Sequence, residues 1–356
     1  MRLRHGIAVS SAHAAELHGT PGPMRVLLTG AAGFIGSHVA ERLLSRGDEI
    51  VAIDNFDETL YPAAVHEENL AHVRTHARAG ALQFVRGDIL DADAVSALLD
   101  GGRVDAVVHL AALAGVRPSL REPLRYSKVN VDGTVILLEA MRARAMRRLV
   151  FASSSSVYGV RNEVPFRESD PAVHPASPYA ATKRAGELLC DLYASIAGMT
   201  VASLRFFTVY GPRQRPEMAI HLFARSILDG RPVQVFGDGE TARDYTYIDD
   251  IVDGVVAALD STAPGGTTEG HRVYNLGGAR TTTLKRLVEL LEGALGTRAI
   301  IDRQPDQLGD VPLTCADVTN ASGALGYSPR VTIEEGINRF CGWLRASRGA
   351  GAKLTE

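Results

Sequence analysis

Short apolar runs alternate with longer amphipathic stretches along the chain up to about residue 206. Runs of five or six residues bounded by turn formers are typical of strands, and the amphipathic stretches between them are typical of helices. The pattern predicts helices such as 35–45 and 133–145, and strands at residues 25–29, 49–53, 82–86, 106–110, 148–153 and 201–206. Strand–helix alternation predicts an α/β fold, a doubly wound parallel sheet with helices on both faces.

The pattern changes after about residue 205, where prolines and glycines crowd a stretch of weaker periodicity. We therefore predict a main domain over residues 24–205, with a later return segment near 245–275. Residues 206–345 are expected to form mainly a smaller C-terminal substrate-binding lobe over the C-terminal edge of the sheet, and residues 346–356 a flexible tail. Residues 1–23 carry Arg2 and Arg4 with no apolar run behind them, so a disordered extension, or an upstream start before Met24, is expected rather than a secretory signal.

Composition narrows the functional classes. The 356 residues are 46% hydrophobic, enough for a sizeable core, and the formal net charge of -3 gives no reason to expect nucleic acid. No apolar run approaches the ~20 residues of a membrane span, so no membrane partner is expected. Cys190, Cys315 and Cys341 lie far apart without metal-ligand spacing, so we predict reduced thiols in a cytoplasmic protein and no metal site.

Three glycines, Gly30, Gly33 and Gly36, join the first predicted strand to the first helix. Glycines let the backbone approach a pyrophosphate, and the helix N-terminus offers amides and a positive dipole end. The spacing is G-x-x-G-x-x-G, and a plain turn is the alternative. Asp54 ends the second strand, where a carboxylate accepts ribose hydroxyls and repels a 2′-phosphate, which favours NAD over NADP; a turn role is the alternative. Asp88 follows the third strand in the same way. Its carboxylate is expected to contact the adenine amino group, and a helix N-cap is the alternative role.

A second group of residues indicates proton transfer from a hydroxyl group. Ser177 and Pro178 are typical of a helix start, which places Tyr179 and Lys183 one turn apart on one face. A tyrosine has a pKa near ~10, and a neighbouring ammonium favours the phenolate. Tyr179 is thus a candidate general base, with Ser154 at a strand end as relay. The alternatives are a surface helix with a half-buried tyrosine, and a serine run that only forms a turn.

These segments together resemble the extended short-chain dehydrogenases/reductases of the sugar-nucleotide epimerase/dehydratase type, with a Rossmann-type NAD-binding domain. The resemblance spans residues 24–344 and also rests on 109–112, 153–159 and 243–250. A closer resemblance, to the UDP-glucuronate 4-epimerase family, rests on 177–187, 205–212, 215–219 and 309–312. It implies a UDP-sugar substrate and a bound NAD that accepts a hydride from C4 of UDP-glucuronate and returns it to the opposite face. It also implies a homodimer through helices such as 133–145 and 180–194.

The family's functional residues carry over by motif. Tyr179, Lys183 and Ser154 are implied as the catalytic group. Tyr179 and Lys183 also belong to the NAD site, whose other residues are Gly30, Gly33, Phe34, Ile35, Gly36, Asp54, Asn55, Asp88, Ile89, Leu110, Ala111 and Ala112. The substrate site comprises Ser154, Ser155, Ser156, Thr208, Arg215, Met218, Ala219, Phe223, Val235, Phe236, Arg243 and Asp310, with Arg117 a weaker candidate. Arg243 and Asp310 lie at the positions where members of the family bind the UDP group.

One departure within the superfamily bears on the reaction. Dehydratases and decarboxylases of this type carry an acidic residue just before Val-Tyr-Gly, whereas this chain has Ser155 and Ser156 there. Without that carboxylate the C5 proton lacks its usual base, which leaves C4 epimerisation. The alternatives are a 4-epimerase of UDP-glucose or UDP-N-acetylglucosamine, a UDP-glucuronate decarboxylase and, from another class, a non-catalytic NAD-binding regulator.

Overall fold

A seven-stranded sheet in which all neighbouring strands run parallel forms the centre of the protein. The computed structural model describes residues 22–161, 163–305 and 312–352, so most of the expected N-terminal extension and the end of the expected tail lie outside the described residues. The strand order is β11-β6-β5-β4-β1-β2-β3. The strands are β1 (Arg25–Thr29), β2 (Glu49–Asp54), β3 (Leu82–Arg86), β4 (Ala106–His109), β5 (Arg148–Ser154), β6 (Thr200–Phe206) and β11 (His271–Leu276).

The strand order reverses between β1 and β4. After β1 the chain winds outward to β2 and β3, and it then returns across the sheet to β4 and winds the other way through β5 and β6. Loops leaving the carboxyl ends of β1 and β4 therefore diverge to opposite faces. Such a switch point leaves a crevice at that edge of the sheet, where open α/β folds place their ligands.

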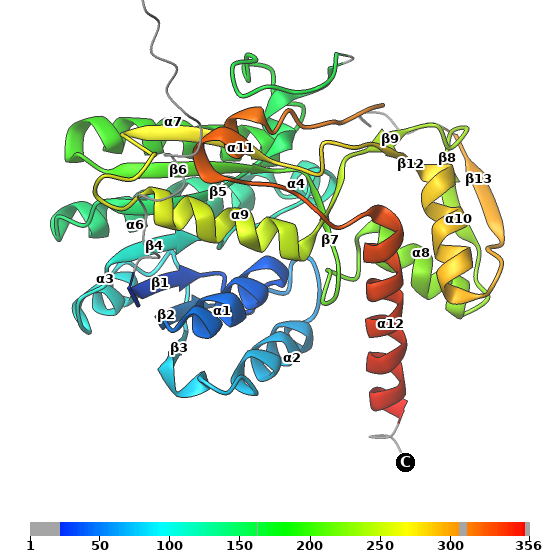
Figure 1. Ribbon diagram of the computed structural model, residues 1–356, viewed down its shortest axis with the longest axis horizontal. Helices are drawn as coiled ribbons and strands as arrows, with labels where there is room; N and C mark the ends of the chain where they lie inside the picture. Colours follow the sequence, from blue (N-terminus) through cyan, green and yellow to red (C-terminus); the bar gives the residue numbers. More distant parts are fainter. Residues whose placement is uncertain (1–21, 162, 306–311, 353–356) are drawn as a thin grey trace, which may run out of the picture.

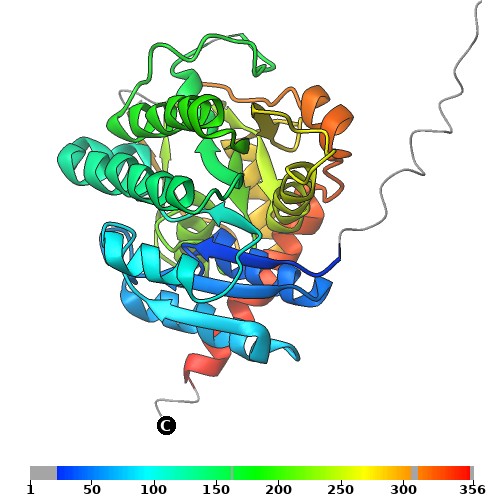
Figure 2. The same cartoon turned by 90° about the vertical axis from the view of Figure 1, so that its left-hand side faces the viewer.

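Helices cover both faces of the sheet, as Figure 2 shows along the sheet edge. The two faces alternate along each strand, so that Val26 and Leu28 of β1 join one core while Leu27 joins the other. One face carries α1 (Phe34–Arg46), α2 (Ala63–Arg74) and α9 (Ile248–Ser261), and the other carries α3 (Ala92–Asp100), α6 (Gly133–Ala143) and α7 (Pro178–Ala197). Shorter elements connect them: η1 (Ala79–Ala81), α4 (Val116–Arg121), α5 (Pro123–Ser127), η2 (Lys128–Asp132) and η3 (Ser155–Tyr158).

A smaller lobe lies to one side of the sheet, at the right of Figure 1. Its strands form two-stranded pairs, β7 with β10, β9 with β12 and β8 with β13. Its elements are β7 (Thr208–Tyr210), α8 (Ala219–Leu228), β8 (Val233–Phe236), β9 (Ala242–Arg243), β10 (Tyr245–Tyr247), β12 (Thr282–Thr283), α10 (Leu284–Leu295), β13 (Ile301–Gln304) and α12 (Ile333–Ala352). The helix α11 (Thr319–Leu325) packs instead beside α9 and β11 at the sheet. Between β10 and β12 the chain returns to the sheet through α9 and β11, so the lobe is not one continuous segment.

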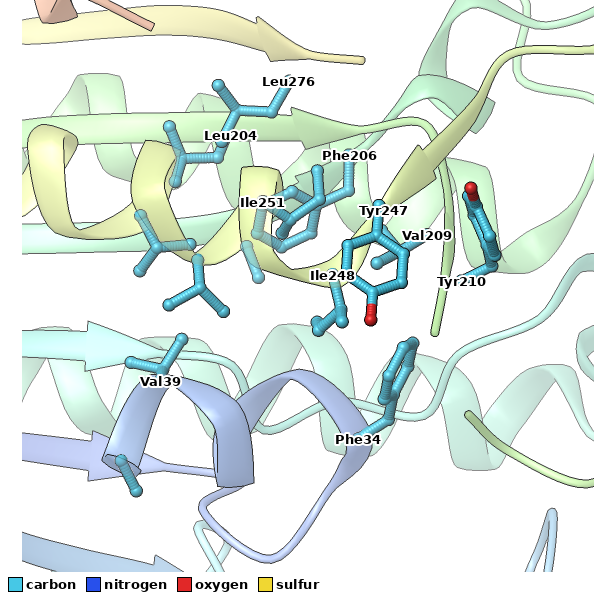
Figure 3. Close-up of a cluster of buried hydrophobic side chains, with 14 of the residues drawn as sticks. Phe34, Val39, Leu204, Phe206, Val209, Tyr210, Tyr247, Ile248, Ile251 and Leu276 are labelled. Carbon is cyan, nitrogen blue, oxygen red and sulfur yellow. The ribbon is translucent and has the colours of Figure 1, made fainter. Parts of the chain in front are cut away.

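One hydrophobic core runs from the sheet into the lobe. In Figure 3, Phe34 and Val39 of α1 lie opposite Ile248 and Ile251 of α9, with the side chains of β6 and β7 beside them. The same buried cluster continues to Phe340 and other residues of α12. Because apolar burial is the main stabilising term in folding, this shared core holds the lobe against α1 and the sheet.

The six predicted strands are all present, with ends that differ by a residue. β4 ends at His109 and β5 extends to Ser154. The flexible tail expected from residue 346 is wrong as far as residue 352, because α12 continues to Ala352. The buried face of Ile337, Phe340 and Leu344 anchors this helix. Once nucleated, a helix gains a hydrogen bond with each added residue, which carries α12 through the poor helix formers Gly349 and Gly351.

The contact between α7 and β5 gives a stability prediction. A Cβ added at Gly186 of α7 would lie 2.3 Å from Cζ of Phe151, whereas a Cβ at Gly293 of α10 would meet nothing within 4 Å. Gly186→Ala should lower the free energy of unfolding by about 1–3 kcal/mol through overpacking. The matched control Gly293→Ala should raise it by about 0.5–1 kcal/mol through helix propensity. Denaturant titration measures both, and equal effects of the two changes would contradict the packing argument.

Candidate active site

Two connected cavities lie along the carboxyl ends of the strands, at the switch point between β1 and β4. One has a volume of about 290 Å³ and the other about 110 Å³. They share Gly30, Gly33 and Leu110, and also Leu60 and Tyr61 from the loop after β2. A third cavity of about 940 Å³ opens between α8, β8 and β9 of the lobe. Thr208 and Met218 line both this cavity and the larger of the first two, so the three form one continuous trough.

The glycine turn between β1 and α1 forms the floor of the first two cavities. Gly30 has φ +71, and a Cβ there would lie 2.7 Å from the backbone nitrogen of Ala111. A Cβ at Gly36 would lie 2.0 Å from the carbonyl oxygen of Gly30, so neither position tolerates a side chain. Gly33 is the N-cap of α1 and offers no side-chain cap. The uncapped amides of the first helical turn therefore have the arrangement that suits a pyrophosphate.

Asp54 lies at the smaller cavity, as the spacing predicts. It is buried, and its Oδ2 and Oδ1 accept hydrogen bonds from the backbone amides of Ala32 at 3.0 Å and Phe56 at 2.9 Å. Burial raises the pKa of Asp54, while these two amides and the charge of His66 oppose the rise. The turn role and the ligand role are thus compatible, because each carboxylate oxygen keeps a further lone pair.

Asp88 also lines the smaller cavity, with Asn55 and Ile89. Its carboxylate accepts hydrogen bonds from Asn55 Nδ2 and from the amide of Leu90, each at 2.9 Å. The alternative of a helix N-cap is wrong for Asp88, because α3 is capped by Asp91. Asp88 therefore stays available at the cavity wall.

The start of α7 lies where it was predicted, and it brings Tyr179 and Lys183 close to Ser154. Ser177 is the N-cap, its Oγ accepts a hydrogen bond from the amide of Ala180 at 3.1 Å, and proline begins the helix. Tyr179 and Lys183 then line the 290 Å³ cavity beside Ser154. Ser154 hydrogen-bonds the Tyr179 side chain, and its Oγ lies 3.1 Å from Oγ of Ser156.

Burial dominates the electrostatics of this group. It raises the pKa of Tyr179, against which the hydrogen bond from Ser154 and the positive charge of Arg215 act. It also lowers the pKa of Lys183 to about 8. Lys183 Nζ donates to the carbonyl oxygen of Ala152 at 2.8 Å. The positive charge of Arg215 therefore also acts on Tyr179 in this structure, a contribution that the spacing of Tyr179 and Lys183 did not indicate.

A buried ionic network supports the catalytic residues from below. Glu187 of α7, one turn after Lys183, accepts from Ser153 Oγ at 2.6 Å and from Arg205 of β6 at 2.8 and 2.9 Å. Arg184 adds a bond of 2.9 Å to the same carboxylate. Because Glu187 and Arg205 are both buried, breaking the pair would leave an uncompensated charge. The network thus fixes α7 against the ends of β5 and β6.

The expected substrate residues divide between two cavities. Ser155, Ser156 and Arg215 lie in the 290 Å³ cavity with the catalytic group. Ala219, Phe223, Phe236 and Arg243 line the 940 Å³ cavity, together with Met218 and Thr208, which belong to both. Val235 is buried in the core, so its side chain does not face the trough. Asp310 lies outside the described residues.

Asp244 holds the segment that carries Arg243. It is fully buried and accepts hydrogen bonds from the amides of Gly278 at 2.6 Å, Ala316 at 2.9 Å and Ala279 at 3.1 Å. Two stretches that are far apart in the sequence, residues 278–279 and residue 316, are thus tied to the carboxylate of Asp244. Asp244 does not itself line the trough, but its hydrogen bonds hold the strand that carries the neighbouring Arg243.

Several wall residues were missed by sequence reasoning. Leu60 and Tyr61 belong to both smaller cavities, and His66 lines the 110 Å³ cavity. Arg117, by contrast, was a weaker candidate from the sequence; it lines the 940 Å³ cavity, where its guanidinium lies 5.6 Å from the centre of the Phe236 ring. The signal in the sequence for Leu60 and Tyr61 is that this apolar pair directly follows the polar residues 57–59 in the loop after β2. No group of His, Cys, Asp or Glu in the described ranges has the arrangement of a metal site, and no helix there is long and apolar enough to cross a membrane.

The crevice, the glycine turn and the Ser–Tyr–Lys group define a nicotinamide-nucleotide enzyme that transfers hydride at a carbon bearing a hydroxyl. The NAD dependent epimerase/dehydratase family model matches residues 26–277, and the chain belongs to that family. It is 41% identical over 352 residues to UDP-glucuronate 4-epimerase 1 of Arabidopsis thaliana, covering 95% of this chain and 80% of the relative.

Solved structures agree with this membership. The structure of UDP-glucuronic acid 4-epimerase from Bacillus cereus, in complex with UDP-glucuronic acid and NAD, superposes with a TM-score of 0.83 at 37% identity, covering 91% of this chain and 100% of that one. UDP-glucose 4-epimerase from Thermotoga maritima, with UDP-glucose, gives a TM-score of 0.82 at 33% identity over 91% of this chain and 100% of that one. The predicted fold class is confirmed, and NAD is the family's cofactor.

The lowered pKa of Lys183 gives a pH prediction. The pKa is about 8 in the folded protein and 10.5 ordinarily, so between these values the unfolded chain binds the additional proton. Stability then rises with pH in that window, and the burial penalty applies in full below pH 8. The free energy of unfolding of wild type minus that of Lys183→Met should rise by up to about 1.4 kcal/mol per pH unit above pH 8. The same comparison with exposed Lys285→Met should stay flat, and a flat Lys183 difference would contradict the burial argument.

Proposed function

We propose that this protein converts UDP-glucuronate to UDP-galacturonate by NAD-dependent epimerisation at C4, through a transient 4-keto sugar. One observation carries the choice of reaction: Ser154, Tyr179 and Lys183 share a cavity with Ser155 and Ser156, and those two positions lack the acid of dehydratases and decarboxylases. The names of the similar proteins from Arabidopsis thaliana and Bacillus cereus support the same substrate.

The residues present fit an NAD molecule. The glycine turn is a cradle that a Cβ at Gly30 or Gly36 would fill, and α1 presents uncapped amides to it. Asp54 and Asp88 place carboxylates at the smaller cavity for the adenosine part. NAD, when bound, supplies the site for the hydride of C4. We assign the binding of NAD to residues 24–205 with the return through α9 and β11, and the binding of UDP mainly to residues 206–345.

Proton movement falls to the catalytic group. Tyr179 removes the proton of the 4-hydroxyl and later returns it, with Ser154 bridging the substrate hydroxyl and the phenol. Burial raises the pKa of Tyr179, so the phenolate requires nearby positive charge. Arg215 provides some of this charge. We assign Lys183, one turn after Tyr179 on α7 and in the same cavity, as the electrostatic partner of the base. A non-catalytic NAD-binding protein would need no phenol aligned with a serine at the cofactor cavity.

The substrate carboxylate needs its own partners. The 4-keto intermediate is a β-keto acid, which loses CO2 when the carboxylate bond aligns with the carbonyl π system. Ser155, Ser156, Thr208 and Arg215 line one cavity and supply the hydroxyl and guanidinium donors that can hold the carboxylate out of alignment. The larger cavity, with Phe236 and Arg243, is assigned to the uracil and diphosphate, since guanidinium suits phosphate.

We also propose a cytoplasmic homodimer. Leu188, Leu192 and Ile196 form an exposed apolar stripe along α7 at four-residue spacing, and Leu124 lies exposed on α5, which contacts α7. Exposed apolar patches mark association surfaces, and α6 and α7 lie side by side at the outer edge in Figure 2. The three unpaired cysteines suit a reducing compartment. Sedimentation equilibrium checks the dimer, and a monomer at micromolar concentration would contradict it.

The reaction itself is tested with one substrate and one variant. NMR of UDP-glucuronate incubated with protein and NAD should show UDP-galacturonate and no UDP-pentose. Tyr179→Phe should lower turnover at least about 100-fold, because it removes the general base and keeps the ring, while the protein still retains NAD. Near-normal turnover in Tyr179→Phe would contradict the assignment of the base, and a UDP-pentose product would indicate a decarboxylase.

The substrate is tested at the carboxylate site. Thr208→Val and Arg215→Leu should lower kcat/KM for UDP-glucuronate about 10- to 100-fold, since a lost charged hydrogen bond costs about 1.5–3 kcal/mol, with much smaller effects on UDP-glucose. The Thr208 change is also expected to release CO2 from the loosened intermediate. A wild-type preference for UDP-glucose, or equal losses on both sugars, would favour a UDP-hexose 4-epimerase instead.

A further inference from the structure

His66 on α2 is a buried polar side chain in the wall of the 110 Å³ cavity, which is assigned above to the adenosine part of NAD. It is 6% exposed and lines this cavity with Asp54. Its ring is stacked between two others, 4.6 Å from Tyr61 at 17° and 5.6 Å from Phe56 at 12° between ring planes. Phe56 adopts φ +58, a strained backbone for a bulky residue, so the stack is held in place at a cost.

Neither ring nitrogen of His66 has a hydrogen-bond partner among the described residues, although both are buried. Nδ1 lies 3.6 Å from Oδ1 of Asp54, slightly beyond hydrogen-bond length. Leaving a buried polar group without a hydrogen-bond partner is costly, so such a group indicates a partner that completes its bonding. Asp54 is the polar side chain that a shift of well under 1 Å would bring into range, because the stacked rings confine other movement.

Asp54 needs such a partner to recognise a ribose. Its carboxylate must be ionised to accept ribose hydroxyls and to repel a 2′-phosphate, yet burial raises its pKa and the nearby Asp57 adds to the rise. The surroundings of Asp54 also contain a positive charge, which would favour a 2′-phosphate. Arg86 pairs with Asp54 in the sheet register, is exposed, and lies 4.7 Å over the Phe56 ring, where a cation would attract a phosphate.

We propose that His66 is a positioning residue for cofactor selection: its Nδ1–H donates to Oδ1 of Asp54, holds the carboxylate toward the ribose hydroxyls and so favours NAD over NADP. His66 acts through Asp54 and not on the reacting atoms. The inference rests on the proposed NAD site but not on which sugar is the substrate.

The test measures bound nucleotide rather than activity. Purified protein is incubated to equilibrium with equimolar NAD and NADP, desalted and denatured, and the two released nucleotides are quantified. Wild type should release almost only NAD. His66→Phe keeps the ring stack but removes both nitrogens, and it should lower the NAD/NADP ratio about tenfold. His66→Gln keeps a donor and should stay within about threefold of wild type. His72→Phe, an exposed change on the same helix, is the matched control and should leave the ratio unchanged.

Thermal unfolding of each variant separates selection from folding. If His66 serves only packing, His66→Phe and His66→Gln would change stability and leave the ratio at the wild-type value, which would overturn the proposal. If His66→Phe is not recovered folded, His66→Met removes the nitrogens without the ring and should show the same loss of selectivity. An unchanged ratio in His66→Met would equally overturn it. Because no sugar is present, failure here is distinct from failure of the proposed epimerase reaction.

Discussion

The close approach of backbone to backbone at the glycine turn is the constraint on which the rest of the site depends. Gly30 lies against the backbone of Ala111, and Gly36 lies against the carbonyl of Gly30, at separations that leave no room for a side chain. This packing determines where α1 begins, and α1 in turn packs on α9 and the lobe through one continuous core. The cofactor floor, the crevice and the position of the lobe therefore follow from a few ångströms of backbone packing.

Burial of charge is the second organising constraint, and it opposes stability. Lys183 and the Glu187–Arg205 pair are all buried, and burying ions is costly even when they are paired. The cost is offset by hydrogen bonds that satisfy both oxygens of Glu187 and by the carbonyl that accepts from Lys183. The same low-dielectric surroundings strengthen each charge that acts on Tyr179. Apolar residues at these positions would avoid the cost of burying charge, but the site would then lack the charged groups that support proton transfer.

The helix α1, whose amides face the cofactor cavity, also makes contacts between the sheet and the smaller lobe. Arg213, in the loop after β7, has φ +65 and forms a bidentate ion pair with Glu41 of α1, with bonds of 2.9 and 2.5 Å. His38 of α1 contacts the carbonyl of Pro212 at 3.0 Å, and burial lowers its pKa to about 4, so it is neutral at physiological pH. The loop that leads to Arg215 and Met218 is thus fixed to the helix whose amides face the cofactor.

The sequence by itself determined the fold class, the strands, the glycine turn, the capped start of α7 and the group of Ser154, Tyr179 and Lys183. Most of these features are local, because periodicity, turn chemistry and the spacing of Tyr179 and Lys183 are specified by neighbouring residues within one element. Ser154 lies on another element, and its place in the group came from the resemblance to a known family. Only the tertiary structure decided which side chains meet across elements. It showed Arg215 acting on Tyr179, Tyr61 joining two cavities, Val235 turned into the core, α12 continuing past residue 346 and His66 beside Asp54. Such contacts join segments far apart in the chain, and a pattern within one segment carries no information about the distance to another.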